Sequence, residues 1–417
     1  MPGLFHELEW RGLVHQVTDP ELPALLDRAS LTGYIGFDPT ADSLHVGNLL
    51  QLCNLRRFQE AGHTPIALAG GGTGMVGDPS GKSEERSLLT KERLDANLAA
   101  IRGQLARFLD FERGALLVDN GEWLWSTGLL EFLRDIGKHF TVNQMMAKES
   151  VRARLEEREH GISYTEFSYM LLQAYDFLHL FDTHGCRLQM GASDQWGNIT
   201  MGVDLIRRLR GETAYGLTTP LVVKADGTKF GKSESGTVWL DPAKTSPYAF
   251  YQFFVRAEDA VVGQYLRYFT WLPREEIEAL DAATAERPEK REAQRALARE
   301  VTALVHGAEE AERAEQAAAV LFTEEIASLD ERTLLAVLAE VPSSEVAAGT
   351  TLVDALVATG LVASKGEARR ALQQKGVYVN NRQQADDRAL AADDTLHGRF
   401  VVLRRGKREQ ALVELRA

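Results

Sequence analysis

The chain has 417 residues and a formal net charge of −13 at pH 7, with 44% hydrophobic and 26% charged residues. These values are ordinary for a soluble globular protein, so they exclude a wholly disordered chain, and the length is enough for two or three domains. The two cysteines lie far apart and belong to no Cys-x-x-Cys or Cys/His cluster, which predicts neither a disulfide framework nor a zinc site.

The start of the chain has none of the features of a secretory signal. Residues 1–7 lack a basic region followed by an apolar core, and no apolar run in the sequence is long enough to span a bilayer. We therefore expect a cytoplasmic protein with no membrane partner.

The first elements predict a parallel sheet. Short helices are expected within residues 1–30, then a strand at Thr32–Phe37, a helix over 46–61 and a strand at Thr64–Ala69. A strand, helix, strand order implies a parallel pair with a right-handed crossover. This is the unit of a Rossmann-like sheet, whose ligands lie beyond the carboxyl ends of the strands.

The junction between the first of these strands and its helix has the features of a nucleotide site. Unpaired N–H groups and partial positive charge at a helix start attract phosphate. His45 can donate to a phosphate oxygen, and Gly47, which has no side chain, would let a purine ring approach. Taken alone, the pattern also fits an ordinary capped helix.

A glycine-rich loop follows over residues 70–83. It looks like a phosphate-binding P-loop, but Val76 stands where that motif requires glycine, which excludes a P-loop NTPase. The loop still offers Asp78 as an anion and Lys82 and Arg86 as cations.

The next segments are predicted to be a helix over 88–112, a strand at Ala115–Val118 and a mixed helical stretch over 129–160. That stretch is unusually apolar. Core packing and a subunit interface both explain its composition.

A further helix begins near Tyr164 and places Tyr169, Gln173 and Asp176 on one face. A phenol, an amide and a carboxylate inside an apolar helix predict a polar site, with a solvent-facing stripe as the alternative. After a strand at Arg187–Met190, a second strand-to-helix turn puts Asp194 where Rossmann-type sites bind ribose.

The second half divides into smaller parts. Pro220–Val223 is predicted to be the last strand of a Rossmann-like domain covering residues 1–224, and 225–244 a mobile lysine-containing loop. Residues 245–340 are expected to form a helical domain, and 341–349 a linker rich in proline, serine and glycine.

The tail, residues 350–417, is basic. It holds 12 Lys and Arg against 8 Asp and Glu, whereas the rest of the chain is acidic. Ser364 and Glu367 predict a capping box, and cations cluster near that helix at Lys365, Arg369, Arg370 and Lys375. Such a cluster predicts RNA binding, with a solvated charged face as the alternative.

Three motifs together resemble the bacterial tyrosyl-tRNA synthetases, a family of class I aminoacyl-tRNA synthetases. They are Gly36-Phe37-Asp38-Pro39-Thr40 with His45-Val46-Gly47-Asn48, then Ser193-Asp194-Gln195-Trp196-Gly197-Asn198, and Lys229-Phe230-Gly231-Lys232-Ser233. The first and last look like the HIGH and KMSKS signatures of that class. The tail looks like the S-four-like RNA-binding domain first named in a ribosomal small-subunit protein.

The resemblance implies an α/β fold: a Rossmann-like parallel-sheet catalytic domain, an α-helical domain and a small α+β RNA-binding domain. It also implies that L-tyrosine attacks the α-phosphate of ATP, with Mg²⁺ accompanying the ATP, and that tyrosine is then transferred to tRNA(Tyr). A homodimer is implied, and no protein-bound metal site.

By motif position, the resemblance assigns roles to individual residues. ATP would contact Gly36, Asp38, Thr40, His45, Gly47, Asn48 and Asp194, the last through its ribose. Pyrophosphate would be held by Lys82, Arg86, Lys229, Lys232 and Ser233. The tyrosine ammonium would bind Asp78, Tyr169 and Gln173, its hydroxyl Tyr34 and Asp176, and Gln195 with Asp38 would orient the substrates.

Three residues depart from the family pattern: Asn48, the pair Phe230-Gly231, and Ala192 where glycine is common. A methyl group at Ala192 could crowd the ribose, unless the backbone there has negative φ. Tryptophanyl-tRNA synthetase is the nearest alternative, and another nucleotidyl transferase is a more distant one. An RNA-binding protein built on an inactive synthetase scaffold is the alternative from another functional class.

Overall fold

The computed structural model describes residues 3–80, 89–156, 161–228, 230–233, 236–339, 341–407 and 409–416. The chain divides into two compact units, one formed by Met1–Lys244 with Ala257–Ala293 and the other by Thr245–Arg256 with Gln294–Ala417. Residues 257–293 therefore group with the N-terminal unit, whereas the sequence places them in a helical domain over 245–340.

The N-terminal unit is built on a six-stranded sheet with the order β1-β6-β5-β2-β3-β4. All neighbouring strands are parallel except β1, which runs antiparallel to β6. The strands are β1 (Gln16–Val17), β2 (Thr32–Phe37), β3 (Thr64–Ala69), β4 (Leu116–Asp119), β5 (Cys186–Ala192) and β6 (Tyr215–Thr219). A separate hairpin is formed by β7 (Lys232–Ser233) and β8 (Gly236–Thr237).

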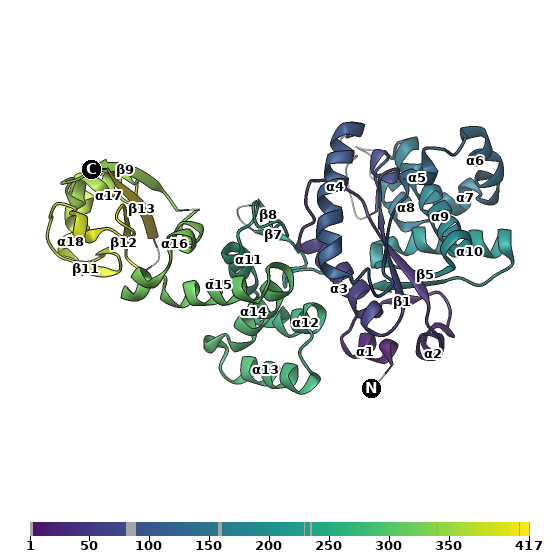
Figure 1. Ribbon diagram of the computed structural model, residues 1–417, viewed down its shortest axis with the longest axis horizontal. Helices are drawn as coiled ribbons and strands as arrows, with labels where there is room; N and C mark the ends of the chain where they lie inside the picture. The colour runs from purple at the N-terminus through teal and green to yellow at the C-terminus, as the bar shows by residue number, and fades with distance from the viewer. Residues whose placement is uncertain are drawn as a thin grey trace. The chain divides into compact units, whose positions relative to one another are not determined.

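Helices connect and cover these strands. They are α1 (Leu4–Trp10), α2 (Leu22–Arg28), α3 (Val46–Glu60), α4 (Lys91–Phe108), α5 (Gly121–Leu124), α6 (Leu129–Asp135), α7 (Val142–Met146), α8 (Glu149–Glu156), α9 (Tyr164–His184), α10 (Trp196–Arg210), α12 (Asp259–Phe269) and α13 (Arg274–Glu286). Short 3₁₀ turns lie at Thr73–Met75, Gly137–His139, Ser193–Gln195 and Pro288–Lys290. Figure 1 labels β1 and β5 of the six-stranded sheet, among helices of the same unit that include α3, α4, α9 and α10.

The β2-α3-β3 unit confirms the predicted parallel pair. Its register runs from Thr32 opposite Thr64 to Phe37 opposite Ala69. On the other edge of β2 lies β5, also parallel. The chain places β3 on one side of β2 and β5 on the other, so the order of the strands reverses at β2. The ligands of open α/β sheets bind at such switch points.

The last strand is not Pro220–Val223, as the sequence suggests, but the five buried residues of β6. Proline has no N–H to give to a ladder, so the strand ends before Pro220. Beyond it, Leu221 and Val223 are exposed. The two-residue β1 was also not predicted.

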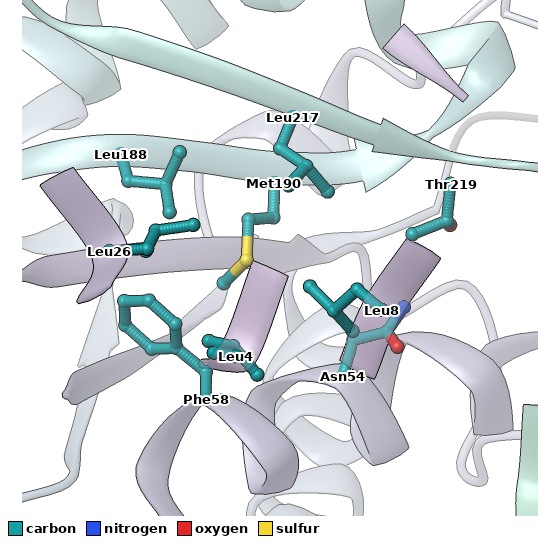
Figure 2. A pocket seen from close by; sticks show the side chains of 9 residues that line it. All are labelled: Leu4, Leu8, Leu26, Asn54, Phe58, Leu188, Met190, Leu217 and Thr219. Carbon is teal, nitrogen blue, oxygen red and sulfur yellow. The ribbon is translucent and has the colours of Figure 1, made fainter. Parts of the chain in front are cut away.

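One face of the sheet packs against α9 and α10, which lie side by side. On the opposite face, α1, α2 and α3 enclose an apolar cavity of about 10 Å³. Figure 2 shows its lining: Leu4, Leu8, Leu26, Asn54, Phe58, Leu188, Met190, Leu217 and Thr219. This volume is near the minimum for one water molecule, so the cavity is too small for an organic substrate.

The C-terminal unit contains α11 (Pro247–Val255), α14 (Glu292–His306), α15 (Ala308–Val320), α16 (Glu331–Val337), α17 (Leu352–Ala358) and α18 (Lys365–Gln373), with 3₁₀ turns at Glu324–Ser328 and Ala392–Asp394. Its five-stranded sheet has the order β11-β10-β12-β13-β9. The strands are β9 (Ser343–Ala347), β10 (Val377–Val379), β11 (Arg382–Gln384), β12 (Phe400–Arg405) and β13 (Glu409–Arg416). The last part of the chain is thus a small α+β domain.

The predicted linker over 341–349 is wrong, because it contains β9. This strand pairs in parallel with β13, from Ser343 opposite Leu412 to Ala347 opposite Arg416. It lies at the sheet edge and its side chains are half-buried or exposed, which explains a composition typical of a loop. Among the described residues, no helix combines the length and apolarity needed to cross a bilayer.

Candidate active site

Polar side chains gather at the carboxyl edge of the N-terminal sheet. Asp38 follows β2, Thr73 lies in the turn after β3, Asn120 follows β4, and Gln195 lies in the turn after β5. Because all four strands are parallel, these residues meet at one edge, beside the switch point between β2 and β5.

The start of α3 is capped by its own motif residues. The N–H of Gly47 donates to His45 Nδ1 at 3.0 Å, and the N–H of His45 donates to Asn48 Oδ1 at 3.1 Å. Since Nδ1 is an acceptor, the ring proton lies on Nε2 and is available to a ligand. Burial lowers the pKa of His45, so the ring is neutral near pH 7.

Gly47 has a further reason to be glycine. A Cβ at this position would lie 2.7 Å from Cε1 and 2.8 Å from Nδ1 of His45. The structure therefore gives one reason for this glycine, which is the closeness of the imidazole ring. Space for a purine stays a prediction. A larger residue would displace His45 from its cap.

Gly36 lies inside the central strand β2 yet is exposed. The nearest described atom to a Cβ built on it is Leu68 Cδ2, at 3.9 Å. Thr40, just beyond the end of the strand, is also exposed. An exposed glycine in a central strand marks a place where another group can approach the backbone closely.

Asp38 accepts hydrogen bonds from the described side chains of Tyr169 and Thr73. Tyr169 Oη donates to Oδ2 at 3.0 Å, and Thr73 Oγ1 donates to Oδ1 at 2.9 Å. Burial, with the charges of Asp38 and Asp78, raises the pKa of Tyr169 well above its usual value, so the phenol is a donor. Two predicted site residues, Asp38 and Tyr169, are thus in direct contact.

A second network joins Asp78 to two amides. Gln195 Nε2 donates to Asp78 Oδ2 at 2.6 Å, and Gln173 Nε2 donates to Gln195 Oε1 at 3.1 Å. Asn198 Nδ2 donates to Gln173 Oε1 at 2.9 Å. Asn198 was quoted in the turn motif but given no role by the sequence analysis; its position three residues after Gln195, in the first turn of α10, is the signal that could have suggested one.

Asp176 is buried and held by two donors from outside its own helix. Asn120 Nδ2 donates to Oδ2 at 2.9 Å, and Trp123 Nε1 donates to Oδ1 at 2.8 Å. Burial raises the pKa of Asp176 to about 7, although both hydrogen bonds oppose the shift. Sequence reasoning found neither Asn120 nor Trp123.

Tyr34 Oη is buried and has no hydrogen-bond partner among the described residues. Burial and the charge of Asp176 raise the pKa of Tyr34 well above its usual value. A buried hydroxyl without a partner is costly, so it points to a polar group that is supplied by a ligand.

The turn after β5 holds Asp194 in a 3₁₀ turn, half-buried. Ala192, immediately before it, has φ −77°. This is the negative φ that the sequence analysis required, so the backbone at Ala192 is unstrained.

Five predicted phosphate-binding residues are only partly covered by the structure. Lys82, Arg86 and Lys229 lie outside the described residues, and Lys232 with Ser233 is described as the strand β7. The neighbouring backbone lies against the start of α3: Val46 N–H donates to Val238 O at 3.0 Å, and a Cβ on Gly231 would lie 3.4 Å from Gly47 N.

The predicted RNA-binding residues lie on and after α18. Ser364 caps this helix through the N–H of Glu367, as expected. The Glu367 carboxylate, however, accepts from the N–H of Ala363 rather than from Ser364. Lys365 forms an ion pair with Asp354 at 2.6 Å, whereas Arg369, Arg370 and Lys375 are exposed.

Comparison with known proteins gives two family matches. Residues 27–323 match the family described as tRNA synthetases class I (W and Y). Residues 334–413 match the tyrosine–tRNA ligase SYY-like C-terminal domain.

Relatives match along the whole chain. A tyrosine–tRNA ligase of Roseiflexus castenholzii is 56% identical, with 100% of both chains covered. That of Geobacillus stearothermophilus is 54% identical over 98% of this chain and 99% of the relative. Among solved structures, a C-terminally truncated mitochondrial tyrosyl-tRNA synthetase of Aspergillus nidulans has TM-score 0.70 and 33% identity, covering 77% of this chain and 95% of that one.

Proposed function

The chain belongs to the class I tRNA synthetases of the tryptophan and tyrosine group, and we propose how its sheet edge performs the tyrosine–tRNA ligase reaction. L-tyrosine reacts with ATP to give tyrosyl-adenylate and pyrophosphate, and tyrosine then passes to the 3′-terminal adenosine of tRNA(Tyr). The substrate carboxylate is already a nucleophile, so the first step needs no general base. Positioning and charge stabilisation supply the catalysis.

The tyrosine side chain binds between Tyr34 and Asp176. The observation that carries the proposal is the buried Tyr34 Oη without a partner among the described residues, close to a carboxylate whose other donors are Asn120 and Trp123. A phenol hydroxyl placed there donates to Asp176 and accepts from Tyr34. An amino acid without the hydroxyl would leave both groups unpaired.

The ammonium group of tyrosine binds the second network. Asp78 provides a carboxylate, and Tyr169 and Gln173, four residues apart on α9, provide two oxygen acceptors. Hydrogen bonds link Asp78 to Gln173 through Gln195, and Tyr169 to Asp38. Gln195 and Asp38 orient the two substrates because each contacts a residue of this network.

ATP lies over the exposed Gly36 and the start of α3. His45 Nε2–H, Thr40 and Asn48 contact the phosphates and adenosine, Gly47 leaves room for the base, and Asp194 holds the ribose. Lys82, Arg86, Lys229, Lys232 and Ser233 hold the departing pyrophosphate. Mg²⁺ arrives with the ATP phosphates as part of the substrate. The reaction takes place in the cytoplasm.

The test is exchange of labelled pyrophosphate into ATP without tRNA, comparing tyrosine, phenylalanine and tryptophan. Exchange with tyrosine alone is expected. Exchange with tryptophan would assign the site to the sister enzyme, and no exchange with any of the three would favour an RNA-binding protein on an inactive scaffold.

The α18 cations contact tRNA(Tyr) through its phosphates. Arg370→Glu is expected to raise the KM for tRNA in aminoacylation and to reduce the slope of log affinity against log salt by about 1, because one phosphate contact is lost. Pyrophosphate exchange should stay at the wild-type rate. Arg332→Glu on α16 makes the same charge change in the same unit and serves as the control. An equal rise of the KM for tRNA in Arg370→Glu and Arg332→Glu would contradict a specific contact between Arg370 and the tRNA.

We also propose a homodimer formed through the 129–160 stretch. Leu129 and Leu130 on α6 are 72% and 81% exposed, and Val142 on α7 is 60% exposed. Large apolar side chains that are exposed repeatedly within one segment favour an interaction surface, and a symmetric pair would cover them on both subunits. Sedimentation equilibrium should give twice the chain mass of 46.2 kDa.

A further inference from the structure

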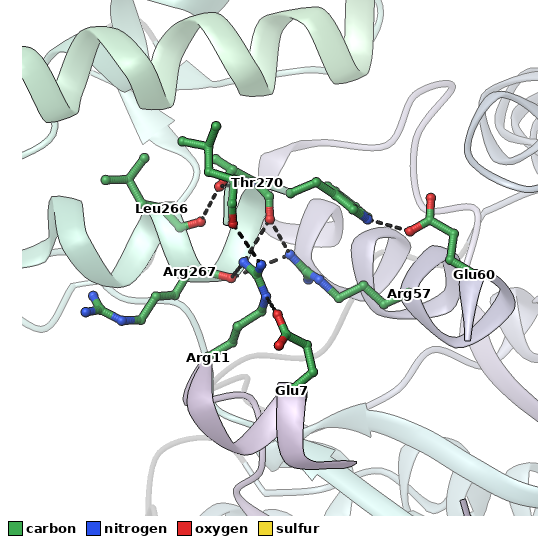
Figure 3. Close-up of polar contacts among 9 residues, drawn as sticks. Glu7, Arg11, Arg57, Glu60, Leu266, Arg267 and Thr270 are labelled. Carbon is green, nitrogen blue, oxygen red and sulfur yellow. Dashed lines mark hydrogen bonds and ion pairs between the residues drawn. The ribbon is translucent and has the colours of Figure 1, made fainter. Parts of the chain in front are cut away.

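Two buried arginines meet at the carboxyl end of α12 (Figure 3). Arg11, after α1, donates through Nη1 to Arg267 O at 3.0 Å and to Thr270 O at 2.9 Å. Arg57, in the last turn of α3, donates through Nη2 to Thr270 O at 3.0 Å. Both side chains are only 6% exposed. Three segments that are far apart in sequence are therefore joined at one point.

The contact fits the electrostatics of a helix end. The last carbonyls of a helix lack partners within it and carry partial negative charge, so cations are favoured there. Glu7 accepts from Arg11 Nε at 2.6 Å. The Arg57 guanidinium also lies over the Trp271 ring, 4.5 Å from its centroid. Burial lowers the pKa of Arg57 to about 10, which leaves it charged at neutral pH.

The same helix supports the loop that carries the pyrophosphate lysines. Phe230, between Lys229 and Lys232 in sequence, is buried against α12: its ring lies 5.0 Å from Tyr265 and 5.6 Å from Phe269, centroid to centroid. Tyr265 Oη donates to Val223 O at 2.7 Å, which fixes the chain just before the loop. The start of the loop is thus anchored on α12.

The helices α3 and α12 and the 229–233 loop are connected to one another. The amino end of α3 carries His45 and Gly47 and lies against Gly231 of the loop, while its carboxyl end holds α12 through Arg57. Arg57 comes ten positions after Gly47 on this helix, a distance of about 15 Å along its axis. Arg57 is therefore too far from the nucleotide site to touch ATP, yet it bonds to the helix on which the loop rests.

We propose that Arg57, supported by Arg11, is a positioning residue for the activation step: by holding the end of α12 on α3, it sets where Phe230 anchors the 229–233 loop beside ATP. The proposal rests on the proposed role of that loop in holding pyrophosphate. Displacement of a positioned group by a fraction of an ångström is enough to reduce a rate severely, so a residue remote from the chemistry can control it.

The test compares Arg57→Lys, Arg57→Met, Phe230→Leu and the double variant Arg57→Lys/Phe230→Leu in the full chain. Lysine keeps the charge but cannot present a planar fork to the carbonyls or stack equally on Trp271. We expect Arg57→Lys to raise the KM for ATP in tyrosine-dependent pyrophosphate exchange by about tenfold. The Kd of tyrosine, measured by equilibrium dialysis without ATP, should stay within about twofold of wild type, because α12 does not contact that network.

The double variant separates a shared mechanism from two independent defects. If both residues act through the contact between the loop and α12, the KM for ATP of the double variant is no higher than that of the worse single variant. The control is Arg28→Lys in the same unit: Arg28 also lies in the last turn of a helix, α2, but its side chain is exposed and donates to Ala24 O of that same helix. It should leave the ATP kinetics unchanged.

The proposal would be overturned if the effects of the two single variants on the KM for ATP added in the double variant. It would also be overturned if Arg57→Lys weakened tyrosine binding as much as ATP binding, or left the KM for ATP at its wild-type value. Thermal unfolding by circular dichroism shows whether each variant is folded at the assay temperature. If Arg57→Met is unfolded, the proposal is tested by Arg57→Lys and by its combination with Phe230→Leu. Absence of exchange in the wild-type chain would instead overturn the proposed function, and this inference with it.

Discussion

Replacing Asp176 with alanine is expected to abolish tyrosine activation, with kcat/KM for tyrosine at least about a hundredfold below wild type. The carboxylate is the acceptor for the substrate hydroxyl, and a donor left unpaired in a buried site costs about 3 kcal/mol or more when its partner is charged. Pyrophosphate exchange at varied tyrosine concentration measures the loss. A near-normal kcat/KM would remove Asp176 from the tyrosine site.

The pH dependence of tyrosine binding gives an independent check on the same carboxylate. Its ordinary pKa is 3.8, and burial raises it to about 7 in the empty protein. Below pH 7 the group is therefore protonated, and a neutral carboxyl is a weaker acceptor for the phenol than a carboxylate. Tyrosine affinity should fall as the pH drops below 7, by up to about tenfold per unit.

Asp176→Asn is the matched variant for that measurement. It keeps the shape of the side chain but does not titrate, so its weak tyrosine binding should be flat between pH 5.5 and 8. Tyrosine binding is measured without ATP, so that titration of His45, which is proposed to contact ATP, does not affect the pH profile. A sloping profile in the asparagine variant would place the titrating group elsewhere.

Local patterns explain which parts of the fold could be predicted. The strands Thr32–Phe37 and Thr64–Ala69 are short apolar runs between polar turns, and their bounds agree with β2 and β3. The face formed by Tyr169, Gln173 and Asp176 follows from helical spacing alone. In each case the information lies within a few turns of the same element.

Other features depend on residues far along the chain. β9 exists because β13, about seventy residues later, gives it a partner, and an edge strand of serine and glutamate has no apolar pattern of its own. Asn120 and Trp123 reach Asp176 from β4 and α5, which only the strand order brings close. No local spacing relates these residues.

The arginine cluster was missed for a related reason. Arg57 lies in a helix, where an arginine usually faces solvent, and the sequence shows nothing of the α12 carbonyls that receive it. Its burial becomes intelligible only when a helix end from residues 259–269 lies against α3. Motifs identify the residues that contact substrate more readily than the residues that position the helices and loops carrying them.

Replacing His45 with alanine is expected to lower kcat for tyrosine activation by about 10²–10³-fold while the Kd of tyrosine stays at its wild-type value. Nδ1 accepts from Gly47 N–H, so the ring presents Nε2–H to the ATP phosphates. Loss of one preoriented donor to charge that develops in the transition state has an effect of this size. Single-turnover formation of tyrosyl-adenylate measures kcat, and equilibrium dialysis measures tyrosine binding.

His45→Ala also removes the cap of α3, which alone costs about 1 kcal/mol of stability. His45→Asn separates the two roles, because asparagine is a good N-cap residue whose amide is too short to reach where Nε2 lies. If His45 acts on the phosphates, the asparagine variant keeps wild-type thermal stability and is as slow as the alanine variant. If its rate instead returns to that of wild type, His45 serves activation only by shaping the start of the helix, and the donor to the phosphates must be another group.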